Sequence, residues 1–167
     1  MREFDANGLR LAEFQGRLFE KSADVFDCST KVFLRRFFYS DLLKAIDKND
    51  SVLLSLDPLE GLGEIESQFG KSDYGKTKWN PNVLFWIGYL YRYISYTRET
   101  ETKFIMRLFP PDKLKDVYYA YHTQSNEWVV ENLLSLAKVH ESVFDKNFRL
   151  KEAIGRIDSS KRTNPRP

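Results

Sequence analysis

The sequence predicts an all-α fold, a single compact multi-helix domain around a central aromatic helix, and three observations support this. Apolar residues recur at spacings of three, four and seven along most of the chain. Cap-plus-proline pairs typical of helix starts occur at Asp57-Pro58 and Asn80-Pro81. No segment shows a convincing strand-like alternation. A chain of 167 residues can bury roughly 70% of its unfolded surface, which suffices for one stable core.

The first half of the chain predicts short amphipathic helices. Leu11 and Leu18 would lie on the buried face of the first one. The run Ser51–Leu56 is too short for periodicity to separate a strand from a buried helical turn, and we favour a helix. Asp57–Glu60 supplies the cap, the proline and the acidic third residue of a helix that Gly70 ends. In order, the expected helices cover residues 9–24, 31–39, a short segment from 40 or 41, 51–56 and 58–69.

The predicted central helix follows a polar, glycine-containing loop over residues 70–80. It begins at Pro81 and extends to about Arg98, and it is apolar or aromatic on nearly every side. Such a helix is expected to be the most buried one in the domain.

Two short helices after it predict a helix-turn-helix-like pair. Thr100 or Thr102 would cap a helix over residues 103–109, and a turn at Pro110-Pro111 leads into a second helix over 112–122. The second helix has the place of a DNA-reading helix, but it lacks the Arg, Asn or Gln side chains that suit base edges. The pair is therefore a weak DNA-binding signal.

The C-terminal part predicts one more helix and a basic tail. Ser125 would begin a helix over residues 127–138, with Trp128 and Leu133 among the apolar residues at helical spacing. Basic residues outnumber acidic ones by seven to two from residue 146 onward. We expect a single helical domain over residues 1–158 and a disordered basic tail over 159–167.

Composition and charge exclude several classes of protein. Twenty-six basic and 24 acidic residues leave a net charge of +2, too little to draw the whole molecule onto nucleic acid or anionic lipid. The longest apolar stretch, residues 83–91, falls well short of the ~20 residues that span a bilayer. With the single cysteine, Cys28, and no basic-then-apolar signal, the sequence favours a cytoplasmic location and no membrane contact.

Signals for catalysis are weak throughout the chain. Gly61 and Gly63 lack the third glycine or the lysine of a phosphate loop. His122 and His140 lack the close spacing of metal ligands, and Cys28 has no signature of a thiol enzyme around it. The sequence therefore predicts no enzyme, no metal site and no cofactor.

Tyrosine-rich runs at residues 89–96 and 118–121 are the most distinctive feature of the sequence. Tyrosine suits a core helix with one wet end, a protein interface or, less often, base stacking. A helix cannot expose every side, so some of these residues belong to the core. The candidates for partner contact are Tyr91, Arg92, Tyr93, Tyr96, Arg98, Tyr118, Tyr119 and Tyr121.

The segments 88–98 (GYLYRYISYTR), 103–105, 118–123 (YYAYHT) and 127–134 (EWVVENLL) resemble a bacterial family of small helical proteins. Its members are identified as antitoxin components, are described as helix-turn-helix proteins of the Xre type, and are found beside toxins that resemble ADP-ribosyltransferases. The resemblance covers mainly residues 80–137, and the segment 14–57 is similar to longer members.

The resemblance implies that the protein binds a cognate toxin, which can be ADP-ribosyltransferase-like, and silences it by direct protein–protein contact without chemistry of its own. The alternative is a DNA-binding transcriptional regulator or operon autorepressor. A homo-oligomer that uses the aromatic helix as its seam, a structural role and an enzyme of unknown type also remain open.

Overall fold

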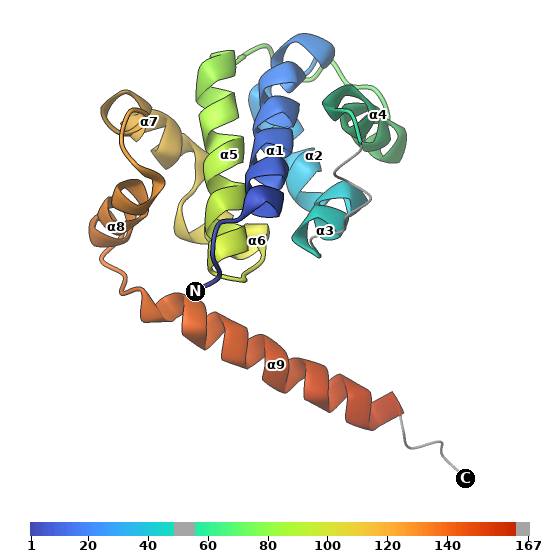
Figure 1. Cartoon of the computed structure of the whole chain (residues 1–167). Helices are drawn as coiled ribbons and strands as arrows, with labels where there is room; N and C mark the ends of the chain where they lie inside the picture. Colours follow the sequence, from blue (N-terminus) through green and yellow to red (C-terminus); the bar gives the residue numbers. More distant parts are fainter. Residues whose placement is uncertain (49–55, 163–167) are drawn as a thin grey trace.

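The computed structural model describes residues 1–48 and 56–162, with side chains placed through residue 154, and all of its regular structure is α-helical (Figure 1). Nine helices and no strands occur in this described part, which confirms the predicted all-α class. The helices are α1 (Ala6–Val25), α2 (Thr30–Tyr39), α3 (Asp41–Asp47), α4 (Pro58–Phe69), α5 (Pro81–Thr97), α6 (Thr102–Leu108), α7 (Pro111–Tyr121), α8 (Asn126–Leu136) and α9 (Ser142–Arg162).

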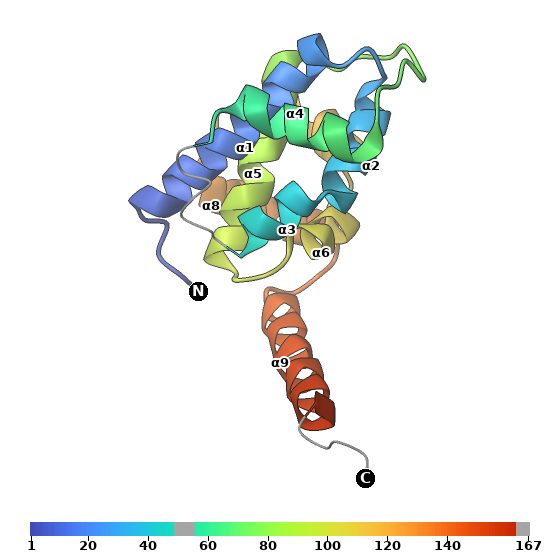
Figure 2. The same cartoon turned by 90° about the vertical axis from the view of Figure 1, so that its right-hand side faces the viewer.

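Helices α1 and α5 lie antiparallel at the centre of the domain, with α2–α4 on the α1 side and α6–α8 on the α5 side (Figures 1 and 2). Twelve of the 17 residues of α5 are buried, so the predicted central aromatic helix is confirmed. Aromatic side chains also gather around α1. The ring of Phe19 meets those of Phe33 and Phe37 edge-on at centroid distances of 5.4 and 4.7 Å.

The backbones of α1 and α5 approach each other closely because glycine stands at the contact on both helices. A Cβ atom at Gly88 would lie 2.7 Å from the carbonyl oxygen of Gln15, and one at Gly16 would lie 2.9 Å from the ring of Phe85. The side-chain amide of Gln15 uses this approach to donate a 2.9 Å hydrogen bond to the carbonyl of Gly88. Any side chain at these glycines would push the two central helices apart.

Local capping signals place most helix starts where the sequence predicts them. The Asp57 carboxylate accepts from the amide of Leu59 at 2.7 Å, and Glu60 accepts from the amide of Asp57 at 3.1 Å, as in a capping box. Asn80 and Ser125 cap α5 and α8 with their side chains. These short-range patterns fix where the chain enters α4, α5 and α8.

The expected cap of α6 is wrong. Glu101 is the residue before the helix and makes no side-chain cap, while Thr102 lies inside the first turn. The free amide of Thr102 instead donates to both carboxylate oxygens of Asp47, at 3.3 and 3.2 Å. A side chain at the end of α3 therefore caps α6 across the fold, which a local pattern could not indicate.

The helix-turn-helix-like pair exists as α6 and α7, joined through Phe109 and Pro110. The predicted helix at residues 51–56 lies outside the described residues apart from Leu56, which is not helical. No described helix is both long and apolar enough to cross a membrane.

Helix α9 was not expected from the sequence. It extends to Arg162, so residues 159–162 of the expected disordered tail are helical, and it projects away from the domain in both views (Figures 1 and 2). Lys, Arg, Glu, Leu and Ala, which fill much of residues 146–156, all have high helix propensity. The basic composition that suggested a tail is therefore compatible with a solvated helix.

Replacement of Gly88 by alanine tests the close approach of α1 and α5. We expect Gly88→Ala to lower the free energy of unfolding by about 1–3 kcal/mol, the usual cost of overpacking a core, in urea denaturation followed by circular dichroism. Gly63→Ala is the matched control, since it is also helical but meets no atom within 4 Å. The control should be neutral or slightly stabilising. Equal stability of Gly88→Ala and the wild type would contradict this packing.

Candidate partner-binding surface

The structure divides the eight residues proposed from sequence into an interior and an exterior group. Four of them, on the second half of α5, are buried and form core contacts: Tyr91, Arg92, Tyr93 and Tyr96. These four offer no surface to a partner in this conformation. The reason is that other helices and the N-terminal segment cover α5 on several sides, which sequence periodicity alone could not show.

Tyr91 connects α5 to the end of α6. Its hydroxyl donates a 2.6 Å hydrogen bond to the carbonyl of Phe109, and the ring of Phe38 meets its ring edge-on at 5.7 Å. Burial raises the pKa of the Tyr91 phenol well above its ordinary value, and the negative charge of Asp112 adds to the shift. The side chain is a neutral core residue that holds the turn before α7.

Tyr93 and Tyr96 fasten neighbouring segments to α5. The Tyr93 hydroxyl donates to the Glu127 carboxylate at 2.7 Å, and burial, with a smaller effect of this hydrogen bond, raises the pKa of Tyr93 to about 12. The Tyr96 hydroxyl donates to Asp5 at 2.7 Å, and Arg2 lies 3.9 Å over its ring. One tyrosine therefore connects α5 to α8, and the other connects it to the N-terminal segment.

Arg92 is fully buried and is bound on every side. Its guanidinium donates to the Asp47 carboxylate and to the Thr102 hydroxyl, both at 2.6 Å, and to the side-chain oxygen of Gln15 at 3.1 Å. A longer bond of 3.3 Å reaches the carbonyl of Ile46. Burial lowers the pKa of Arg92, and Asp47 opposes that shift. Its role is to join α1, α3, α5 and α6.

Arg98, just after α5, is also bound by other side chains of the protein. Its side chain donates to Glu141 at 2.6 Å and to Thr97 at 3.0 Å. Only 8% of it is exposed. The residue joins the end of α5 to the segment that leads into α9, so it is not a free anchor for a partner.

The three candidates on α7 form the exterior group. Tyr119 is 79% exposed, and Tyr118 and Tyr121 are half-buried. The Tyr118 ring stacks on His122 at 4.5 Å and meets Trp86 of α5 edge-on at 5.6 Å. These contacts hold the rings of α7 in place while one side of them remains open to solvent.

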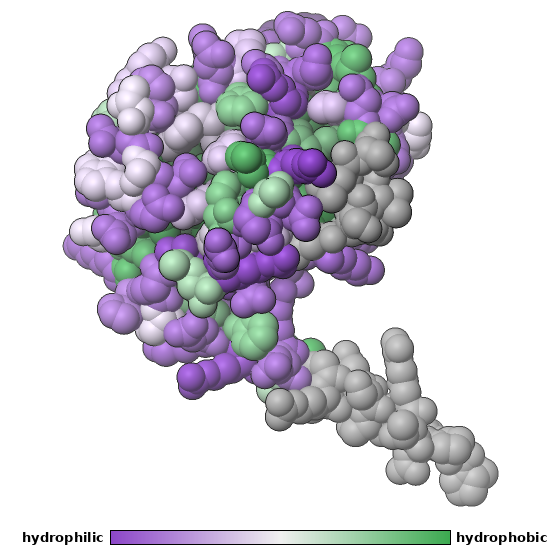
Figure 3. All heavy atoms as spheres, viewed as in Figure 1, coloured by the Kyte–Doolittle hydropathy of each residue, from purple (hydrophilic) through white to green (hydrophobic). Residues whose placement is uncertain are grey.

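Two groups of rings result, one around Tyr118 and one formed by Tyr121 and Trp128, and we call them together the aromatic face. Tyr121 meets Trp128 of α8 edge-on at 5.1 Å, and Arg17 of α1 lies 5.0 Å over the ring of Phe85. A hollow of about 330 Å³ opens between α1, α5 and α7 within it. In Figure 3 the surface over α7 is pale, which is the colour of intermediate hydropathy. The aromatic face consists of Phe85, Trp86, Tyr118, Tyr119, Tyr121, His122 and Trp128.

Sequence analysis missed Phe85, Trp86 and Trp128 as surface residues. The first two were assigned to a buried helix, and Trp128 was counted with an apolar helical face. Trp128 is instead 40% exposed beside the truly buried Val129 and Val130. The available signal was a tryptophan directly before two valines on a short helix. Adjacent helical residues point about 100° apart, so Trp128 and the two valines cannot all share one face.

The described residues hold no group of three His, Cys, Asp or Glu side chains that could bind a metal ion. Cys28 is buried, and Gly61 lies within α4 against Leu18 rather than in a phosphate loop. No protein-family model, curated protein or solved structure matches the chain. The geometry of the aromatic face suits protein contact, since tyrosine and tryptophan are the side chains that most often anchor interfaces.

Removal of the charge of Asp47 tests the buried network. Asp47→Asn leaves the guanidinium of Arg92 in the interior without its counter-charge, which costs roughly 3 kcal/mol or more of unfolding free energy. Asp41→Asn is the control, because Asp41 makes an exposed pair with Lys44 at 2.7 Å and its loss should cost less than about 1 kcal/mol. Urea denaturation of both variants measures the difference. Similar losses in the two would show that the Arg92 network is dispensable.

Proposed function

We propose that the protein is an antitoxin that neutralises a cognate toxin by direct protein–protein binding through the aromatic face, in a cytoplasm that the two share. The observation that carries the proposal is the cluster of exposed and half-buried rings on α5, α7 and α8. The toxin class, an ADP-ribosyltransferase-like enzyme, comes from the resemblance of residues 80–137 to antitoxin components.

The aromatic face has the properties of an interface anchor. Stable complexes bury about 800 Å² on each partner, and most of their binding energy comes from a few tyrosine, tryptophan and arginine side chains. The ring of Tyr118 is already fixed by Trp86 and His122, so its ordering costs little entropy on binding. A rigid cluster of this kind can bind tightly without a conformational change.

Charges of both signs border the aromatic face. Arg17 and Glu20 of α1 form a 2.8 Å pair at its edge. The aromatic face therefore selects its partner by shape and apolar contact, with little electrostatic steering. We expect binding through this face to depend only weakly on salt.

DNA binding by α6 and α7 is the alternative to this proposal. The exposed cations of α7 are Lys113 and Lys115, and Lys115 lies 5.3 Å over the ring of Trp79. Helix α7 carries no Arg, Asn or Gln that could read a base edge. A helix of this composition would contact phosphates at most, with a steep loss of affinity on addition of salt.

Capture of the tagged protein from its native cells at moderate salt tests the proposal, with bound proteins identified by mass spectrometry and nucleic acid assayed in parallel. A single stoichiometric protein from the adjacent gene, whose toxicity is suppressed by co-expression, is the expected result. Recovery of nucleic acid without such a protein, or continued toxicity on co-expression, would contradict it.

Substitution of Tyr119 tests the aromatic face itself. We expect Tyr119→Ala to weaken binding of the captured partner by about 2 kcal/mol, close to thirtyfold, without a change in thermal stability, since the side chain is 79% exposed. Tyr74→Ala is the matched control, because Tyr74 is 78% exposed but lies in the loop before α5. Titration calorimetry compares the two variants. Equal affinity of both for the partner would rule out an interface centred on Tyr119.

A further inference from the structure

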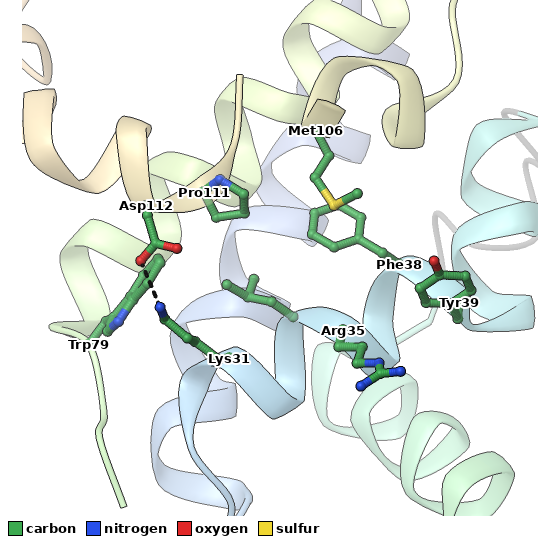
Figure 4. Close-up of a pocket in the computed structure, with 9 residues that line it drawn as sticks. Lys31, Arg35, Phe38, Tyr39, Trp79, Met106, Pro111 and Asp112 are labelled. Atoms are coloured by element: carbon green, nitrogen blue, oxygen red, sulfur yellow. Dashed lines mark ion pairs between the residues drawn. The ribbon is translucent and has the colours of Figure 1, made fainter. Parts of the chain in front are cut away.

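Two hollows border the first half of α7, and they differ in how much apolar surface they expose. In the hollow against α2, Lys31 pairs with Asp112 at 3.3 Å (Figure 4). The side chains at its floor, Leu34 and Phe38, are only 5% and 1% exposed. This hollow therefore offers a partner little apolar contact. The hollow on the α8 side of α7 is different.

That second hollow opens between the end of α6, the first half of α7 and the end of α8, and its volume is about 430 Å³. Leu136 is 62% exposed, and Leu108 and Val117 are half-buried, so their apolar surface is open to solvent. Core side chains close the floor below them. We call this hollow the α7–α8 groove, and its main residues are Leu108, Leu114, Asp116, Val117, Leu133 and Leu136.

Helix α9 carries apolar side chains that are largely open to solvent. Leu150 and Ile154 are 60% and 52% exposed, and their spacing of four residues places them on one side of the helix. After its first turns, α9 projects away from the domain (Figures 1 and 2). The helix therefore has an apolar side that no other described element covers.

The apolar side of α9 cannot reach the groove of its own chain. Asn147 donates to the Thr100 hydroxyl at 2.6 Å, and Lys151 pairs with Glu101 at 2.7 Å. These contacts hold the first half of α9 at the start of α6, whereas the α7–α8 groove lies at the end of α6. While they are in place, the exposed apolar residues of α9 can enter only the groove of another molecule.

The charges of α9 and α8 are complementary. Helix α9 carries six basic and three acidic residues, whereas α8 carries two glutamates and no basic residue. The groove itself is lined by one charge of each sign, Lys113 and Asp116. Asp116 has no cation paired with it among the described residues, and Lys146 of α9 has no carboxylate. Lys146 precedes Leu150 by one turn, so it can reach Asp116 when Leu150 enters the groove.

Nucleic acid and anionic lipid are poorer partners for this pair of surfaces. Phosphate groups would contact the basic side of α9, but they would leave the α7–α8 groove uncovered. A helix with an apolar side fits an apolar groove of this kind, and α9 of a second copy is such a helix.

We propose that two copies of the chain form a dimer in which α9 of each copy inserts Leu150 and Ile154 into the α7–α8 groove of the other. The exchange is reciprocal, so the contact closes without a free helix or a free groove. Two such contacts also double the buried area, toward the roughly 800 Å² per partner of a stable complex. The dimer does not rest on toxin binding, because Tyr119 does not line the groove.

Analytical ultracentrifugation of the full chain over a range of concentrations tests self-association. We expect a monomer–dimer equilibrium that Leu150→Glu and Leu136→Glu each weaken on the order of hundredfold, since either change buries a carboxylate at both contacts. Leu59→Glu is the matched control, because Leu59 is 50% exposed but lies on α4. The control should dimerise like the wild type. Thermal denaturation confirms that each variant is folded.

Disulfide trapping tests which surfaces meet. A mixture of Leu136→Cys and Ile154→Cys chains should form mixed dimers under mild oxidation, because a disulfide needs Cα atoms within about 7 Å of each other. Each variant alone should stay largely uncoupled. The native Cys28 is buried, so it does not compete.

Four results would overturn the proposal. The first is a chain that stays monomeric at every concentration, and the second is a dimer that both glutamate variants leave unchanged. The third is disulfides between two Ile154→Cys chains in place of mixed ones, which would pair α9 with α9. The fourth is a monomer that binds a labelled oligonucleotide or anionic vesicles and loses this binding in Lys146→Glu. None of these measurements involves a toxin, so failure here and failure of the aromatic face are distinguishable.

Discussion

A buried guanidinium at the centre of the molecule is the interaction on which the rest of the structure depends. Arg92 has no exposed surface, and removing a charge from water costs several kcal/mol unless every donor finds a partner. Its partners come from three other helices, α1, α3 and α6, and one of them, Asp47, also caps α6 through the amide of Thr102. Movement of α3 would leave this charge unpaired, and movement of α6 would remove its hydrogen bond to the Thr102 hydroxyl.

This constraint decides which surfaces remain for function. Since Arg92 and the tyrosines beside it are buried, the second half of α5 offers little surface to a partner in this conformation. The outward residues of α5, such as Trp86, contribute only where α7 packs on it. Because the network fixes the start of α6, it also positions Met106 and the turn into α7.

Sequence-local signals predict much of this fold. The capping box at Asp57 and the cap at Asn80 act within a few residues, so the local sequence predicts where those helices begin. The cap of α6 could not be predicted in this way, because its acceptor lies 55 residues away in sequence. Helix α9 was missed because it lacks a strong apolar face, and its charged residues are equally common in disordered chains.

The candidate site was predictable only in part. The run on α5 is aromatic on nearly every side, so periodicity could not tell which tyrosines face the interior. That choice is made by the close approach at Gly16 and Gly88, which depends on tertiary packing. On α7 the tyrosines were correctly placed in a helix, but the exposure of Tyr119 depends on how α7 packs against α5.

In the proposed function, α5 builds the interior while α7 and the start of α8 contact the partner. Hydrogen–deuterium exchange of the protein, alone and with its captured partner, tests this claim most directly. We predict that binding slows exchange in residues 111–128 and leaves residues 90–97 unchanged, since the latter are already buried. Slower exchange that spares residues 111–128 would contradict the account, because the partner would then bind elsewhere.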